Sequence, residues 1–399
     1  MVPCGPMEAP APAPLAPARP SLSWDIFCTV VDNYGDIGVC WRLARQLAAE
    51  HGFAVRLWVD DLASFARLCP ELQVERDWQT VAGVTVQRWA GDFAQVEAAQ
   101  VVVEAFACEL PENYLATMAR APRPPVWINL EYLTAEDWAS HCHGLASPHP
   151  RLPLLKYFFF PGFDARTGGL LRERALIGQR QDFQADTLAR KALWQRLGTT
   201  PSAAERVVSL FCYGHLPVAS LLDAWAQAPS PTLCFMPLGP ALPEVTAWSG
   251  GRLTRAGDRL QVGALRLVLM DFLPQADYDR LLWACDLNFV RGEDSFVRAQ
   301  WAARPLVWQI YPQEENAHEP KLEAFLEAYS EGLETAAAQA LRTFWRAWNG
   351  LDPVLPGACW PAFERQLPAL LAHGRQWSDL QENRPDLAES LARFCRNKL

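Results

Sequence analysis

The sequence predicts an α/β protein made of two Rossmann-like domains that face each other across a cleft. The chain has 399 residues, more than one typical hydrophobic core accommodates, so two domains are expected. Short apolar runs alternate with helical patterns, which is typical of mostly parallel sheets. The alternation is interrupted by a loop-rich region and then begins again, so each part predicts a sheet of its own.

The first 20 residues stand apart from both predicted domains. The segment MVPCGPMEAPAPAPLAPARP is rich in proline and alanine. Such a segment cannot build a core, so residues 1–20 are expected to form a disordered or extended tail.

The first domain is predicted to cover residues 21–180, with its alternation beginning at Trp24. The continuous apolar run DIFCTVV predicts a strand that is buried on both faces. The next segment, IGVCWRLARQLAAEHG, has the apolar spacing of a helix that ends at Gly52. A short helix is predicted near 62–68. Further strands are predicted at VRLWVD, VTVQRW, AQVVVEAFA and PPVWINLEYL.

The second domain is predicted to cover residues 181–374. It follows the loop-rich segment 140–173, which holds several prolines and glycines. Strands are predicted at RVVSLFCYG, PTLCFMPLG, LRLVLMDFLP, DLNFVRGEDS and PLVWQIYPQ, and helices near 185–197, 217–227, 276–284 and 295–303. From about residue 316 the pattern is mainly helical. A C-terminal helix, about 375–399, is expected to pack back on the first domain.

The net charge, the cysteines and the lengths of the apolar stretches argue against several classes of protein. The formal net charge of -9 argues against a general nucleic-acid or anionic-membrane binder. The 11 cysteines form no CxxC pair, and Cys28, Cys212 and Cys285 fall in apolar runs, which predicts small core residues of a reduced protein. There is no signal segment and no apolar stretch of about 18 residues that could span a membrane, so the sequence predicts a soluble, cytoplasmic protein.

Two acidic residues occupy the predicted turn between the first strand and the first helix, DNYGDIG. Ligands bind beyond the carboxyl ends of strands in open α/β sheets, and Asp32 follows such an end. Gly35 and Gly38 would let the backbone turn tightly or approach a ligand. The segment is neither a Rossmann GxGxxG nor a P-loop, and two carboxylates around a glycine turn favour a site for a cationic or hydroxyl-bearing group. For Asp36 alone, a plain helix N-cap is an equally good interpretation.

A second predicted turn, VRGEDSFVRAQWA, has the layout of a phosphate site. A strand ends at Arg291, and the backbone N–H groups of a helix that begins near Ser295 could hold a diphosphate without a metal. Arg291 would assist. Glu293 and Asp294 would repel phosphate and are expected to accept hydrogen bonds from sugar hydroxyls instead. The alternative is that Asp294 and Ser295 only cap the helix.

Aromatic residues follow several strands of the second half, where a base ring could stack on them, although each taken singly is more often a core residue. They are Phe211, Tyr213, Phe272, Tyr278 and Tyr311. Gln275 lies at the start of a predicted helix, where it could form hydrogen bonds to the edge of a pyrimidine base or cap that helix. The pair His141 and His143 has no further ligands at zinc spacing, so no metal is expected.

Four segments in this order carry a resemblance to a known family: VVDNYGDIGVCWRLARQLA, YFFFPGFDARTGGLLRE, RGEDSFVRAQWA and WQIYPQEENAHEPKLEAF. Together they resemble the EarP family of bacterial protein-arginine rhamnosyltransferases over nearly the whole chain after the tail. The resemblance implies a GT-B glycosyltransferase fold, whose two-domain layout other α/β proteins share. It also implies inverting transfer of rhamnose from dTDP-β-L-rhamnose to an arginine of translation elongation factor P, which activates that factor for polyproline synthesis. No cofactor, nucleic acid or membrane is expected.

The resemblance also implies roles for single residues. Asp36 matches the proposed catalytic aspartate and Asp32 a second important acid, with Asn33 and Gly35 lining the same loop. The donor-binding motif corresponds to Arg291, Glu293, Asp294 and Ser295, and the nucleotide pocket to Phe211, Tyr213, Phe272, Gln275, Tyr278 and Tyr311. Tyr278 departs from the family pattern, in which phenylalanine is common, and stacking is expected to survive the change.

The acceptor chemistry limits what Asp36 can do. A guanidinium has a pKa above about 12, whereas an ordinary aspartate has a pKa near about 4 and cannot hold its proton in the ground state. We therefore expect Asp36 and Asp32 to dock the guanidinium through charge-assisted hydrogen bonds, with late proton transfer to Asp36. Two alternatives remain: a nucleotide-sugar-dependent enzyme that acts on a small molecule or lipid, and an inactive binding protein of the same fold.

Overall fold

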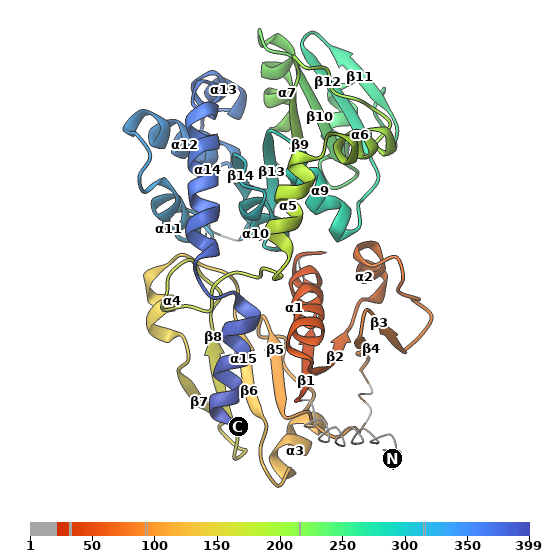
Figure 1. The fold of residues 1–399 in the computed structure, drawn as a ribbon, viewed down its shortest axis with the longest axis vertical. Coiled ribbons are helices and arrows are strands. Elements are labelled where there is room, and N and C mark those ends of the chain that lie inside the picture. Colours follow the sequence, from red (N-terminus) through yellow and green to blue (C-terminus); the bar gives the residue numbers. More distant parts are fainter. Residues whose placement is uncertain are drawn as a thin grey trace, which may run out of the picture.

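The computed structural model describes residues 22–31, 34–91, 93, 95–214, 217–313, 315 and 317–399. The predicted tail and two predicted site residues, Asp32 and Asn33, lie outside the described residues. Over the described ranges the chain forms two sheets with helices packed around each, and the two halves lie end to end in Figure 1.

The first sheet has the strand order β3-β4-β2-β1-β5-β6-β8-β7. Its strands are β1 (Ser23–Cys28), β2 (Ala54–Val59), β3 (Trp78–Val81), β4 (Val84–Arg88), β5 (Val101–Ala105), β6 (Val126–Leu130), β7 (Ala146–Pro148) and β8 (Leu155–Phe159). The inner pairs are parallel, and the edge pairs β3–β4 and β7–β8 are antiparallel. Because β1 lies between β2 and β5, the strand order reverses beside β1, which is where such sheets bind ligands.

The helices that connect these strands within the described residues include α1 (Gly35–His51), α2 (Leu62–Leu68), α3 (Glu112–Arg120) and α4 (Asp137–Cys142). Helix α1 follows β1 directly and ends where Gly52 adopts a left-handed backbone conformation, as predicted. Positions 24–28 of β1 are all buried, as the continuous apolar run predicts for a central strand. The switch point of the sheet is thus occupied by the N-terminus of α1.

The second sheet has the strand order β11-β12-β10-β9-β13-β14. It contains β9 (Arg206–Leu210), β10 (Thr232–Pro237), β11 (Arg259–Val262), β12 (Leu265–Met270), β13 (Leu287–Arg291) and β14 (Leu306–Gln309). Only the edge pair β11–β12 is antiparallel among the pairs of the described residues. The order reverses between β9 and β13, so the predicted donor turn at the end of β13 lies at the switch point of this sheet.

The helices of this half are α5 (Leu176–Ala185), α6 (Thr187–Arg196), α7 (Val218–Gln227), α8 (Leu242–Trp248), α9 (Gln275–Ala284), α10 (Asp294–Trp301), α11 (Glu319–Ser330), α12 (Thr335–Trp348), α13 (Pro356–Arg365) and α14 (Leu367–Glu382). The sequence predicted one helix near 185–197, but α5 precedes it and spans the predicted domain boundary at residue 180. Helix α5 packs against α9.

The C-terminal segment returns to the first half. The sequence predicted one helix over about 375–399, but the chain breaks it in two after Glu382, and α15 (Leu387–Lys398) follows. Helix α14 contacts α10 and α13, whereas α15 packs against α1. In Figure 1, α14 runs down from the second half and α15 continues beside the first sheet. Packing against the first half therefore involves α15.

Separate hydrophobic cores support the two sheets. The three cysteines predicted to be core residues, Cys28, Cys212 and Cys285, are all buried. Among the largest fully buried side chains are six tryptophans: Trp24, Trp225, Trp301, Trp345, Trp348 and Trp360. Over the residues that the structure describes, no helix combines the length and the apolar character needed to cross a membrane.

Candidate active site

Two cavities lie where the switch points of the two sheets meet. Both are lined by the turn at the start of α1 and by the turn between β13 and α10. The first cavity, of about 560 Å³, contains the predicted residues Gly35, Phe211, Tyr213, Phe272, Gln275, Tyr278, Arg291, Asp294 and Ser295. The second, of about 780 Å³, contains the predicted residues Asp36, Glu293 and Tyr311. The fold thus brings together every predicted site residue within its described ranges.

The first cavity is built from aromatic rings. Phe211 lies edge to face with Phe272 and with Tyr278, at centroid distances of 6.1 Å and 5.8 Å. Tyr34 lies 4.5 Å from Phe272, so the first half also contributes a ring. The ring of Tyr278, a position predicted to depart from the family pattern, forms part of this aromatic wall. Such a cavity suits a planar base.

Arg291 supplies the cation of the first cavity. Its guanidinium lies 4.2 Å from the ring centroid of Phe211 and 4.5 Å from that of Tyr213. One of its nitrogens also donates a hydrogen bond to the carbonyl oxygen of Cys212, at 3.2 Å. These contacts hold a buried positive charge against the aromatic wall.

Ser295 shapes the donor turn. Its hydroxyl accepts from the N–H of Arg291 at 3.0 Å and donates to the carbonyl oxygen of the same residue. Gly292 adopts a left-handed φ of 58°, which lets the chain turn sharply from β13 into α10. Helix α10 begins at Asp294, and no side-chain hydrogen bond caps it. The alternative that Asp294 and Ser295 only cap the helix is therefore wrong.

Asp36 is a deeply buried carboxylate of the second cavity, with 2% of its surface exposed. Its Oδ2 accepts a hydrogen bond from the N–H of Val31 at 2.8 Å, and its Oδ1 accepts from the Tyr132 hydroxyl at 3.2 Å. Helix α1 begins one residue earlier, at Gly35, and has no side-chain cap. The interpretation of Asp36 as a plain N-cap is therefore wrong.

Lys321 adds a cation to the second cavity. Burial lowers the pKa of its ammonium below the ordinary value, while the carboxylates of Glu293 and Glu136 act in the opposite direction. Its Nζ lies 5.5 Å from the ring centroid of Tyr132. The lining of the second cavity thus combines a half-buried cation with the carboxylates of Asp36 and Glu293.

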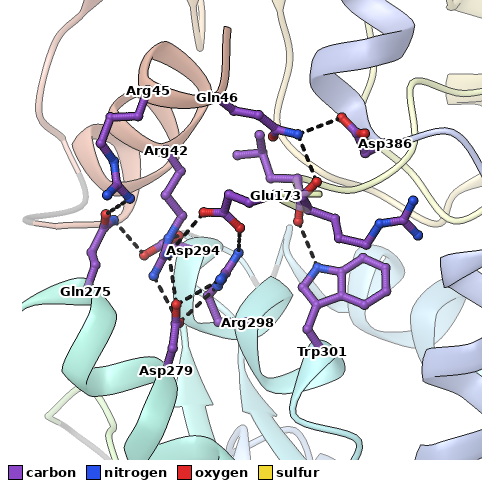
Figure 2. A network of polar contacts seen from close by, with 12 residues as sticks. Arg42, Arg45, Gln46, Glu173, Gln275, Asp279, Asp294, Arg298, Trp301 and Asp386 are labelled. Carbon is purple, nitrogen blue, oxygen red and sulfur yellow. Dashed lines mark hydrogen bonds and ion pairs between the residues drawn. The ribbon is translucent and has the colours of Figure 1, made fainter. Parts of the chain in front are cut away.

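A network of ion pairs joins the two halves beside these cavities (Figure 2). Arg42 of α1 donates through Nε to Asp294 at 2.8 Å and through two nitrogens to Asp279 of α9, each at 3.1 Å. Arg298 of α10 also contacts both oxygens of Asp279, at 3.0 and 2.8 Å, and reaches Glu173 at 2.6 Å. Charge-assisted, bidentate contacts of this kind hold α1 against α9 and α10.

Asp294 and Gln275 are engaged in contacts between the halves. Besides Arg42, the carboxylate of Asp294 accepts from Gln275 Nε2 at 3.2 Å. The same nitrogen donates to the carbonyl oxygen of Gly38 at 3.1 Å, and Gln275 Oε1 accepts from Arg45 at 3.3 Å. The sequence predicted that Asp294 binds a sugar and that Gln275 reads a base or caps α9. In the structure both join α1 to the donor side, and α9 has no side-chain cap.

Several residues of the second cavity were not predicted from the sequence. They are Val31, Tyr132, Leu133, Gly292, Trp308, Ile310, Gln313, His318 and Lys321. His318 and Lys321 belong to the fourth segment of the family resemblance, which was the one available signal for them. Over the described part of the chain, no group of three or more His, Cys, Asp and Glu side chains is placed to hold a metal ion.

Known proteins resemble this chain over almost its whole length. The family model described as elongation factor P (EF-P) rhamnosyltransferase EarP matches residues 24–396. The protein-arginine rhamnosyltransferase of Pseudomonas aeruginosa is 52% identical over 372 residues, covering 93% of this chain and 98% of that protein. The protein of the same name from Shewanella oneidensis is 40% identical over 400 residues, covering 94% and 97%.

A solved structure that concerns EarP-mediated arginine glycosylation of translation elongation factor EF-P matches with a TM-score of 0.69 at 38% identity. It covers 95% of this chain and 100% of that one. The structure of TcCGT1 in complex with UDP matches with a TM-score of 0.53 at 9% identity, covering 95% of this chain and 98% of that one. At this low identity the match supports the fold alone. The predicted GT-B glycosyltransferase fold is confirmed. The chain belongs to the EarP family of elongation factor P rhamnosyltransferases.

Proposed function

We propose that this protein is an inverting glycosyltransferase that moves rhamnose from dTDP-β-L-rhamnose to an arginine side chain of translation elongation factor P. The observation that carries the proposal is the pairing of Asp36 with the donor turn. Its buried carboxylate faces the same cavity as Glu293, and the adjoining cavity is aromatic. Family membership and the names of the relatives support the same acceptor.

The acceptor side of the proposal rests on charge. A guanidinium that enters the second cavity would meet the carboxylate of Asp36, whose oxygens accept hydrogen bonds from the N–H of Val31 and the hydroxyl of Tyr132. An ionised pair of this type is strong and directional, so Asp36 would aim one nitrogen of the arginine at the anomeric carbon. An acid, and not a phosphate loop, at the start of α1 suits a cationic acceptor.

The donor side of the proposal uses both cavities. The thymine ring would stack in the aromatic cavity, the diphosphate would lie against the first turn of α10 and near Arg291, and rhamnose would reach Glu293. Backbone N–H groups at a helix N-terminus favour an anion, and the negative charge on the diphosphate grows as the bond to the sugar breaks.

The chemical step balances without a further reactant. The arginine nitrogen forms a bond to the anomeric carbon from the face opposite dTDP, so the configuration inverts. The bond from that carbon to the diphosphate oxygen breaks, and its electron pair leaves with dTDP. As nitrogen loses its basic lone pair, its proton becomes acidic enough to pass to Asp36.

The test is the intact mass of elongation factor P after incubation with this protein and dTDP-β-L-rhamnose. A gain of one deoxyhexose is expected, together with no gain in an acceptor whose target arginine is replaced by lysine. A chelator is expected to leave the rate unchanged. An unmodified acceptor would contradict the proposal and would favour an enzyme of small molecules or lipids, or an inactive binding protein.

A further inference from the structure

We infer that Tyr132 is a positioning residue for Asp36: its hydroxyl sets the orientation of the carboxylate that receives the arginine. The inference deepens the proposed function and rests on it, because it concerns the same carboxylate. Tyr132 comes two residues after β6 and lines the second cavity, with 38% of its surface exposed.

Within the described residues, each oxygen of the Asp36 carboxylate accepts a hydrogen bond. The N–H of Val31 donates to Oδ2 at 2.8 Å, and the hydroxyl of Tyr132 donates to Oδ1 at 3.2 Å. Because the donors come from different segments and reach different oxygens, together they restrict rotation of the carboxylate plane. The donor from Val31 belongs to the backbone, whereas the hydroxyl of Tyr132 can be removed by a substitution.

Tyr132 is itself held in place from the first half of the molecule. Its ring stacks on Phe106 with a centroid distance of 4.4 Å and an interplanar angle of 15°. Phe106 has a φ of 56°, a left-handed conformation that is uncommon for a bulky residue and often marks functional sites.

The chain around Phe106 is anchored to the next strand. Its N–H donates to the carbonyl oxygen of Leu130 at 2.7 Å, and the N–H of Ala107 donates to Asn129 Oδ1 at 3.3 Å. Since β5 and β6 are parallel neighbours, this turn at the end of β5 lies beside Tyr132 at the end of β6. The unusual backbone therefore serves to place one ring against the other.

The second half also contacts the ring of Tyr132. Lys321 of α11 places its Nζ 5.5 Å from the ring centroid, a distance at which a cation and an aromatic ring attract each other. Contacts from both halves thus limit the movement of the ring, and the ring in turn orients Asp36. Tyr132 acts through Asp36 and needs no contact with the substrate.

Orientation matters because guanidinium and carboxylate are both planar. A rotated carboxylate still attracts the cation but aims a different nitrogen at the sugar, so binding changes less than the rate. Tyr132→Phe, which keeps the ring and removes the hydroxyl, should lower kcat about tenfold or more, as expected for loss of a hydrogen bond to a charged group. The KM for elongation factor P, the affinity for dTDP-β-L-rhamnose and the melting temperature should stay within error.

Tyr157→Phe is the matched control. Tyr157 belongs to β8, and its ring packs against Phe394 and lies 4.7 Å from Lys398 Nζ, away from both cavities. Tyr157→Phe also removes a tyrosine hydroxyl group, but at a position away from both cavities, so its kcat should equal that of the wild type.

Two kinetic results would overturn the inference: an unchanged kcat for Tyr132→Phe, or a raised KM for elongation factor P at unchanged kcat, since Tyr132 would then bind the acceptor directly. If the wild-type protein transfers no deoxyhexose, the proposed function fails, and crystal structures of wild type and Tyr132→Phe decide the inference by themselves. A rotated Asp36 carboxylate in the variant supports the positioning role, and an unmoved one refutes it.

Discussion

Asp36 and Glu293 face one cavity from opposite halves of the molecule, so their roles can be separated by experiment. Asp36 lies in the first turn of α1, and Glu293 precedes α10 in the donor turn. A carboxylate that handles the acceptor should affect the rate, whereas one that holds the sugar should affect the affinity for the donor.

Asp36→Asn should lower kcat by at least about 100-fold, because under the proposed mechanism it removes both the charge that docks the guanidinium and the proton acceptor. Its affinity for dTDP-β-L-rhamnose should be retained. Glu293→Ala should instead lower the affinity for dTDP-β-L-rhamnose about tenfold. Calorimetric titration with the donor and the mass-based rate assay measure the two effects. Near-normal turnover of Asp36→Asn, or unchanged donor affinity of Glu293→Ala, would refute the corresponding role.

Gly38 packs against the second half of the molecule, which the sequence alone did not predict. The sequence suggested that this glycine lets the backbone turn tightly or approach a ligand, but it lies within α1, and the group it approaches is Asp294 of the other half. A Cβ at position 38 would lie 3.0 Å from Asp294 Oδ2 and 3.1 Å from its Cβ. The glycine therefore permits close packing of α1 on α10.

Gly38→Ala should push α1 away from α10, lower kcat about tenfold and cost about 1–3 kcal/mol of unfolding free energy, as overpacking usually does. The matched control is Gly178→Ala in α5, where an added Cβ meets no atom within 4 Å. That variant should gain up to about 1 kcal/mol, because alanine favours a helix over glycine. Equal urea-unfolding curves for the two variants would contradict the packing argument.

Helix α1 is the element that connects the two halves. It carries Asp36 in its first turn and Arg42 less than two turns later, and Arg42 reaches both α9 and α10. The sequence predicted helices at the positions of α1, α9 and α10, and for α1 the helical apolar spacing was the reason. It gave no sign of the ion-pair network, since Arg42, Asp279 and Arg298 read as ordinary polar residues until the halves are placed together.

Glu173 makes this network sensitive to acid. Burial alone would raise its pKa, but the Arg298 and Arg42 guanidiniums outweigh that effect and lower the pKa to about 2. A carboxylate with a lower pKa in the folded state stabilises the fold above its unfolded pKa, near about 4.3, and loses that contribution as the pH falls toward the folded value. The Glu173 side chain is 28% exposed, and solvent screens its ion pairs in part. We therefore expect it to contribute about 2 kcal/mol to the free energy of unfolding at neutral pH.

Glu173→Gln should therefore flatten the pH dependence of unfolding free energy between about pH 4.5 and pH 2. Urea unfolding at several pH values measures this pH dependence of the unfolding free energy. Glu75→Gln, at an exposed glutamate, should leave the wild-type slope unchanged. A wild-type slope in Glu173→Gln as well would show that the ion pairs to Arg42 and Arg298 do not contribute to stability.

Across the whole molecule, the sequence predicts most strands and helices in their order along the chain. It does not predict how the two halves pack against each other. Alternation predicted both sheets and the positions of both turns. The edge strands β3, β7 and β11 were missed, because they are short and their pairing depends on neighbouring strands. The inner strand β8 was missed as well, because it lies in the segment 140–173 that the sequence predicted to be loop-rich. Tyr132 and Lys321 were missed as site residues because only the fold brings them next to Asp36.

Helix α15 completes the first half with residues from the end of the chain. Asp386 at its start accepts from the N–H of Glu389 at 3.0 Å and from Gln46 of α1 at 3.1 Å. Leu391 is fully buried in the same core as β1 and α1. The first half therefore depends on the last residues of the chain for its core.

Leu391→Ala should lower the free energy of unfolding by about 2–4 kcal/mol, because it leaves a cavity under α1. Leu380→Ala, at a position of α14 that is 50% exposed, should change it by less than about 0.5 kcal/mol. Both variants should keep the wild-type affinity for dTDP-β-L-rhamnose at 25 °C, since neither residue lines the aromatic cavity. Equal denaturation midpoints would mean that α15 adds nothing to the core, whereas lost donor binding in Leu391→Ala would mean that α15 also shapes the donor site through α1.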